Sequence, residues 1–194
     1  ALIASGESPA GNTFEAIDLK GADLRGLDLQ GTTWRKCQVT GADFSDALLR
    51  GAKFFGCEMS GCDFSRIDGY RLSARWDSDG SPNSFHEAKF VGAWLRLADF
   101  SGATLTAVVL EGVVASGALF ERVSARGLSA NGSVLDEANF EGAQLEDAKF
   151  GDAELGGRPR SVGPARRWVR GKLTLRGHNN AVEEERQDSG AGTK

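Results

Sequence analysis

The chain has 194 residues, of which 40% are hydrophobic and 26% are charged, and its formal net charge is −4. This length accommodates one domain of ordinary size, and the composition excludes a wholly disordered chain. With two histidines and three cysteines, the composition favours neither a multi-histidine metal centre nor a dense disulfide framework.

Residues 1–11 precede the regular part of the sequence, and we expect them to cap the N-terminal end of the fold. They lack a basic region followed by a long apolar run, which is what a secretory signal requires. The first residue is Ala1 rather than Met, so removal of an upstream leader stays open as an expectation.

From residue 12 onward the sequence has a period of five. Every fifth residue is apolar from Phe14 to Phe64 and again from Phe85 to Leu155, and ten of the 11 phenylalanines fall on this central position. Alanine is frequent two residues before the centre, where all three cysteines also lie, and glycine is frequent two residues after it.

A period of five fits neither an α-helix nor a flat strand. It requires a chain that turns in the same sense every five residues, with the central side chain and the small one two places earlier both pointing inward. Glycine at the corners permits the backbone angles that such turns need. Successive coils must stack to bury the interior, at a spacing of ~4.8 Å. The pattern therefore predicts an all-β solenoid.

Segments such as Ala22-Asp23-Leu24 and Ala138-Asn139-Phe140 resemble the repeat of the pentapeptide repeat family, Ala-(Asp/Asn)-Leu/Phe-X-X. The resemblance covers residues 12–157. It implies a right-handed, four-sided β-helix with four pentapeptides per coil. Residues twenty apart then stack, and we expect Phe100, Phe120 and Phe140 to form an internal ladder.

The period fails at about residues 65–84, where Ser, Asp, Gly, Pro and Asn predict an inserted loop. In this loop Arg75 and Trp76 either form a recognition tip, or Trp76 folds back as a plug. Beyond the loop, Ala115, Ala125 and Ala130 occupy central positions, which predicts a narrower or looser core there.

The residue just before each centre is expected to face outward, and several of these residues are apolar. Trp94, Val114 and Val134 are twenty apart and should stack as an exposed stripe, with Val109 as a further outward apolar residue. Such a strip is a candidate surface for a partner protein, unless the C-terminal tail covers it.

Charge is unevenly distributed: residues 1–155 contain 23 acidic and 14 basic side chains, whereas residues 156–182 contain seven basic and no acidic ones. We expect residues 158–194 to form a short helical or irregular basic cap followed by a disordered acidic end. The basic part either covers the acidic last coil or docks on an anionic membrane or a partner. Its candidate contact residues are Arg166, Arg167, Trp168 and Arg170.

A filled coil has no cleft, and the sequence offers no set of catalytic residues, no metal site and no cofactor motif. Cys37 and Cys57 are either small interior fillers or a disulfide. We therefore predict a non-catalytic protein-binding scaffold that binds no nucleic acid directly. The resemblance implies an alternative, a DNA mimic that protects DNA gyrase or topoisomerase IV from quinolones, dimeric through one end of the coil.

The cellular compartment is left open by the sequence. An odd number of thiols slightly favours the reducing cytoplasm. The family resemblance adds the thylakoid lumen for a chain that has lost a leader.

Overall fold

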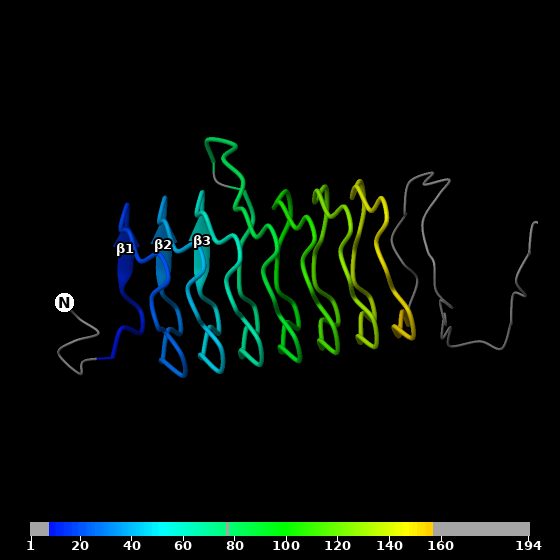
Figure 1. The fold of residues 1–194 in the computed structure, drawn as a ribbon, viewed down its shortest axis with the longest axis horizontal. Coiled ribbons are helices and arrows are strands. Elements are labelled where there is room, and N and C mark those ends of the chain that lie inside the picture. Colours follow the sequence, from blue (N-terminus) through cyan, green and yellow to red (C-terminus); the bar gives the residue numbers. More distant parts are fainter. Residues whose placement is uncertain (1–7, 77, 157–194) are drawn as a thin grey trace, which may run out of the picture.

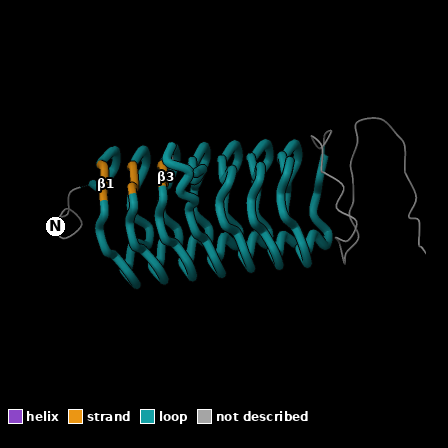
Figure 2. Tube along the Cα trace, turned by 90° about the horizontal axis from the view of Figure 1, so that it is seen from above, coloured by secondary structure: helices purple, strands orange, loops and turns teal. Residues whose placement is uncertain are grey.

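The computed structural model describes residues 8–156, apart from residue 77. In this part the chain winds into stacked coils that form a rod (Figures 1 and 2). Three parallel strands lie on one side of the first coils, β1 (Thr13–Glu15), β2 (Thr33–Arg35) and β3 (Lys53–Phe55), in the order β1-β2-β3. Elsewhere the coils are joined by single parallel bridges.

The register confirms four pentapeptides per coil. Phe14 lies opposite Trp34, and Trp34 opposite Phe54, so paired residues are twenty apart. The other three sides keep the same spacing in the first coils, as Asp18–Gln38, Asp23–Asp43 and Asp28–Leu48 show. The rod therefore has four faces. On each face, the residues just before the central apolar positions form one outward row, and the residues just after them form a second.

The corners are tight turns closed by a backbone hydrogen bond. The N–H of Ala22 donates to the carbonyl of Leu19 at 3.0 Å, and Gly21 between them has a φ of 64°. A left-handed residue at the third position is the requirement of a type II turn, and glycine meets it without steric cost. This explains the glycine phase of the repeat.

The Asp or Asn before each centre has a structural task. The side chain of Asp43 accepts a hydrogen bond from the N–H of Ser45 at 2.9 Å, and Asp63 does the same for Ser65 at 2.8 Å. Asn139 accepts from the N–H of Glu141 in the same way. A short acceptor is needed here because the N–H two residues later points out of the coil ladder.

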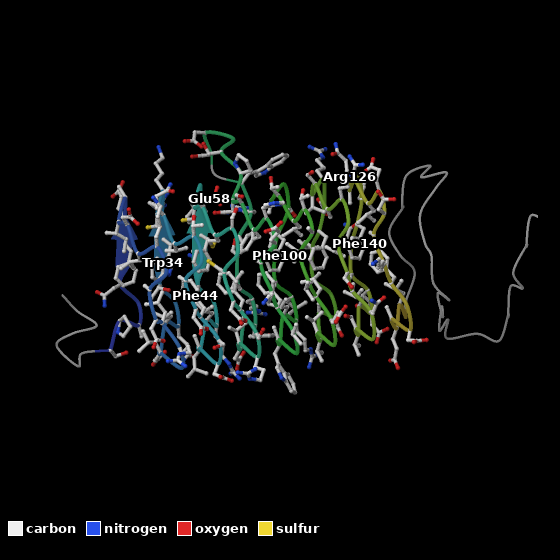
Figure 3. All side chains as sticks on the ribbon, in the orientation of Figure 1. Trp34, Phe44, Glu58, Phe100, Arg126 and Phe140 are labelled. Carbon is white, nitrogen blue, oxygen red and sulfur yellow. The ribbon has the colours of Figure 1, made fainter. Side chains whose placement is uncertain are left out.

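Large side chains fill the interior of the rod, as Figure 3 shows for Trp34, Phe100 and Phe140. The rings of Phe100 and Phe120 stack with centroids 5.5 Å apart, and those of Phe120 and Phe140 at 4.8 Å. This confirms the predicted ladder. Trp34 is fully buried, and its Nε1 donates to the hydroxyl of Thr32 at 2.9 Å, so its polar atom is satisfied.

Where the central residue is small, the other inward residue of the same repeat is large. The expected loosening at Ala115, Ala125 and Ala130 is therefore compensated, and all three are fully buried. Volume is exchanged between the two inward positions rather than lost. The compensating pairs are Ile67 with Gly69, Leu72 with Ala74, Val113 with Ala115, Val123 with Ala125, and Leu128 with Ala130.

The interruption of the repeat is shorter in the structure than the expected range of 65–84. Asp68 and Ser73 still pair with the coils on both sides. The spacing of paired residues then rises from 20 to 26, as between Ser73 and Asp99, so six residues are inserted. The inserted loop lies between Ala74 and Ser84 and projects from the rod after β3 (Figure 1).

Most of the expected N-terminal cap lies outside the described residues. The expected C-terminal cap and acidic end lie wholly outside them. Arg166, Arg167, Trp168 and Arg170 therefore have no described position. Within residues 8–156, no helix has the length and apolar character needed to cross a bilayer.

Candidate protein-binding surface

The structure places Trp94 in an outward row on the fourth face of the coil. We call this side the Trp94 face. Its row before the centre is continuous in the bridge pattern and consists of Asp28, Leu48, Asp68, Trp94, Val114, Val134 and Glu154. Trp94, Val114 and Val134 are thus neighbours along the rod, as their spacing predicts.

Apolar side chains on this face are unusually exposed. Trp94 is 60% exposed and Leu97 47%, whereas Val114 and Val134 are half-buried between their neighbours. Leu48 and Tyr70 extend the exposed apolar surface toward the N-terminal end. We call these six residues the Trp94 strip. A contiguous strip of this kind on an otherwise polar surface is typical of a protein-binding site.

Arginines surround the N-terminal half of the strip. The Nε of Arg50 lies 2.6 Å from a carboxylate oxygen of Asp68, and Arg66 binds Asp46 with both ends of its guanidinium group. The contact with Arg66 lowers the pKa of the Asp46 carboxyl. Arg71 lies over the ring of Tyr70, with its Cζ 5.3 Å from the ring centroid, while Arg96 follows two residues after Trp94.

This combination of side chains is the one that carries binding energy in protein interfaces. Trp, Tyr and Arg are enriched among interface residues whose truncation costs most, because they contribute large, rigid contact areas and polar ends. Val109, the further outward apolar residue predicted from the sequence, lies on the adjacent face, half-buried in the row of Lys89 and Ser129. On that face the exposed apolar residue is Val91, at 42%.

The spacing argument does not identify four exposed apolar residues, which are Leu48, Tyr70, Val91 and Leu97. Tyr70 lies in the stretch predicted as a loop, and Val91 lies just after a central residue, outside the row that precedes the centres. Leu97 occupies the corner phase that glycine dominates, with a φ of 57°. A large apolar residue at a position that favours glycine was the available signal, because only packing or binding would retain it there.

The inserted loop is held against the rod at several points. Trp76 is 42% exposed, yet its ring lies directly on Gly102 at the corner of the next coil. A salt bridge of 3.6 Å joins Lys36 to Asp79. Trp76 is thus folded back against the coil, which is one of the two arrangements considered for it. Arg75 beside it is exposed.

The three cysteines are buried free thiols at the small inward position. Burial raises the pKa of Cys62 to about 12. A hydrogen bond between Cys37 and Cys57 lowers the pKa of Cys37, and the same bond and burial raise that of Cys57. These thiols therefore line the core, as the interpretation of small fillers expects.

The stacked coils define a β-solenoid with four outer faces. The chain belongs to the pentapeptide repeat family, since the family model of pentapeptide repeats (8 copies) matches residues 17–54, 35–68, 84–122 and 116–152. Its architecture is the right-handed, four-sided β-helix that the resemblance implied.

Solved structures of this fold resemble the chain. HetL, a pentapeptide repeat protein involved in heterocyst differentiation regulation from the cyanobacterium Nostoc sp. strain PCC 7120, is 24% identical, with a TM-score of 0.52 over 80% of this chain and 77% of HetL. QnrB1, a plasmid-mediated fluoroquinolone resistance protein, is 25% identical over 76% of this chain and 74% of its own, with a TM-score of 0.43. No curated protein sequence matches the chain.

Proposed function

We propose that this protein is a non-catalytic scaffold that binds another protein chain through the Trp94 face. The observation that carries the proposal is the exposure of Trp94, at 60%, in one apolar run with Val114 and Val134 on a filled rod. An exposed Trp ring gives the isolated rod no advantage, whereas burial of the same ring against a partner contributes strongly to binding. The exposure of Trp94 therefore favours an interface.

The rod itself supports this role because it is pre-organised. Its outward side chains are fixed by a backbone that pairs with the coils before and after, and its interior is closely packed. A surface that does not rearrange loses little conformational entropy on binding, which improves affinity for a given contact area.

Site-specific photo-crosslinking in the native host tests the proposal. A photoreactive amino acid replaces Trp94 in one variant and Thr104 in a control variant, because Thr104 lies in the polar outward row of Ser84 and Ser124 on the opposite face. We expect a discrete crosslinked protein from position 94 and none from position 104. Equal crosslinking from both positions, or none from position 94, contradicts the proposal.

A second candidate function is the DNA mimic that acts on DNA gyrase or topoisomerase IV. It is favoured by the stacked carboxylates of Asp23, Asp43 and Asp63 on one face and by the acid excess of residues 1–155. Arg25 lies between the first two of these carboxylates and lowers the pKa of Asp23 to about 2, which reduces the resemblance to a bare phosphate row.

A supercoiling assay separates the two functions. A DNA mimic changes gyrase activity, with or without a fluoroquinolone, in proportion to the protein added, and the change is abolished by Asp43→Asn with Asp63→Asn. Absence of any effect on supercoiling excludes this candidate and leaves the scaffold function standing.

A further inference from the structure

The Trp94 face is complementary to itself when two rods lie antiparallel. We propose that the occupant of the Trp94 face is a second copy of this chain, related to the first by a twofold axis that crosses the face between the coil of Trp94 and the coil of Val114. This inference rests on the proposed function and names the partner of the same surface.

The charges along the face have opposite signs at its two ends. The N-terminal half contains four arginines, Arg50, Arg66, Arg71 and Arg96, against three carboxylates, Asp28, Asp46 and Asp68. Arg50 is paired with Asp68 and Arg66 with Asp46. The C-terminal half contains only acids, which are Asp136, Glu137, Asp152 and Glu154. Antiparallel packing brings the arginine end of each copy over the acidic end of the other, so attraction acts twice.

The row along the corner after the face fixes the position of the axis. Its members in successive coils are Arg71, Leu97, Gly117 and Glu137. A twofold axis midway between Leu97 and Gly117 places Arg71 of each copy opposite Glu137 of the other. Leu97 already leans over Gly117 of its own chain, where a Cβ would meet Leu97 Cδ2 at 2.8 Å, so the two Leu97 side chains meet at the axis.

The same axis brings together the apolar side chains of the row before the centre. Trp94 of one copy lies over Val114 of the other, and Tyr70 lies opposite Asp136 in the row after the centre. Apolar contacts thus occupy the middle, and the pairs of Arg71 with Glu137 and Tyr70 with Asp136 lie one coil further out. In the outermost coils the same axis places Leu48 opposite Glu154 and Asp46 opposite Asp152. A parallel arrangement instead places the two arginine-rich ends together and the two acidic ends together, which is unfavourable.

The contact area indicates a reversible dimer. From Leu48 to Glu154 the face extends over five coil steps, or ~24 Å, and it is about three strand residues, or ~10 Å, wide. This lies below the area that stable interfaces bury on each partner, ~800 Å². At about 240 Å² on each partner the contact is less than a third of that size, so we expect a weak dimer that forms only at high protein concentration. It should weaken further at high salt, because the charged pairs are exposed.

A charge-exchange experiment on the full-length chain tests the pairing. Arg71→Glu and Glu137→Arg are prepared as separate variants, and their masses are measured by sedimentation velocity alone and as an equimolar mixture. Each variant alone places like charges opposite one another twice, whereas the mixed pair restores both attractions. Arg71 and Glu137 both have a positive φ in the wild-type chain. Each exchange therefore replaces one non-glycine residue by another in the same backbone conformation.

We expect the wild-type chain to reach twice its 20.6 kDa mass over a hundredfold range of concentration. Each variant alone should dissociate at least tenfold more readily, and the mixture should regain wild-type association. Glu87→Arg, at the diagonally opposite corner with a φ of 58°, is the matched control and should leave association unchanged. Thermal unfolding of every variant verifies that it is folded.

Three results overturn the inference. They are a wild-type chain that stays monomeric at all concentrations, a dimer that both charge reversals leave intact, and a mixture that does not regain association. The first result assigns the face to the chain's own C-terminal residues or to a different protein. If position 94 then crosslinks to a different protein, the proposed function stands and only the second copy is excluded.

Discussion

The indole ring of Trp76 lies against Gly102, so closely that a Cβ built on the glycine would lie 2.4 Å from Trp76 Cε3. This contact fastens the inserted loop to the coil that follows it. Gly102 also has a φ of 72°, so it is restrained both by its backbone angle and by the ring above it. The two restraints can be separated experimentally.

Gly102→Ala should destabilise the fold by about 2 kcal/mol, of which about 1 comes from the left-handed backbone angle and the rest from displacing Trp76. Gly112→Ala is the matched control, because Gly112 has a φ of 64° at another corner but nothing within 4 Å of its hypothetical Cβ. Chemical denaturation of both variants gives the difference.

The same pair of substitutions in a Trp76→Ala background completes the test. Without the indole ring, Gly102→Ala and Gly112→Ala should cost the same free energy of unfolding, since only the backbone term remains. If the difference between them persists, the ring is not what restrains Gly102, and the loop is held by other contacts.

The repeat, the coil and the ladder of Phe100, Phe120 and Phe140 could be predicted from the sequence because one central residue in five carries the period. The continuation through residues 65–74 is not visible in the central residues, because these are Gly69 and Ala74. Their volume is supplied by Ile67 and Leu72 at the other inward position. A scan that sums the two inward residues detects these repeats, whereas a scan of central residues alone does not.

The binding surface was predictable in the same limited way. The spacing of Trp94, Val114 and Val134 placed them in one row, since stacking at twenty residues follows from the coil itself. The spacing could not place Tyr70 on the face of Trp94, because the insertion lies between these two residues. Its length sets the register of every residue that follows it. The position of six extra residues between Ala74 and Phe85 is decided by packing and by the hydrogen bonds of Asn83.

Gly69 should tolerate no side chain. A Cβ there would approach Leu95 Cδ2 to 2.9 Å and Ile67 Cδ1 to 3.4 Å, while its backbone angle is one that any residue can adopt. Gly69→Ala should therefore destabilise the fold by ~1–3 kcal/mol through overpacking alone. Truncation of the neighbour provides the control: Gly69→Ala with Leu95→Ala should cost less than the sum of the two single substitutions. Strict additivity in denaturant titrations would show that the two side chains do not compete for space.

Asn83 should be the most sensitive polar residue of the core. Its amide nitrogen donates to the carbonyls of Phe54 at 2.9 Å and Ala74 at 2.8 Å, and its carbonyl accepts from the N–H of Cys57 at 2.9 Å. Asn83→Ala, although alanine is common at this inward position, leaves those groups buried without partners. At ~1–3 kcal/mol for an unsatisfied buried group, we expect a loss of several kcal/mol.

Ser133→Ala is the control for Asn83→Ala. Ser133 is also buried at the small inward position, but it makes a single hydrogen bond, to the carbonyl of Leu110 at 2.6 Å. Its replacement should cost ~1 kcal/mol, the usual net value of one hydrogen bond. Hydrogen exchange adds a local readout, because the amide of Cys57 should lose protection in Asn83→Ala and keep it in Ser133→Ala. Equal losses for the two variants would contradict the role of Asn83 in joining the loop to the coil.

Alkaline pH should weaken the fold through Cys62. Its thiol donates to the carbonyl of Val39 at 3.0 Å, and burial raises its pKa from 9.0 to about 12. Between these two values the folded chain keeps a proton that the unfolded chain has released, so the free energy of unfolding falls as pH rises, by at most ~1.4 kcal/mol per pH unit for one group. Cys62→Ala fits the alanine position of the repeat and removes the titrating group. Denaturation measured from pH 8 to pH 11 should show a shallower decline for the variant than for the wild type, and parallel curves would mean that Cys62 does not titrate differently in the two states.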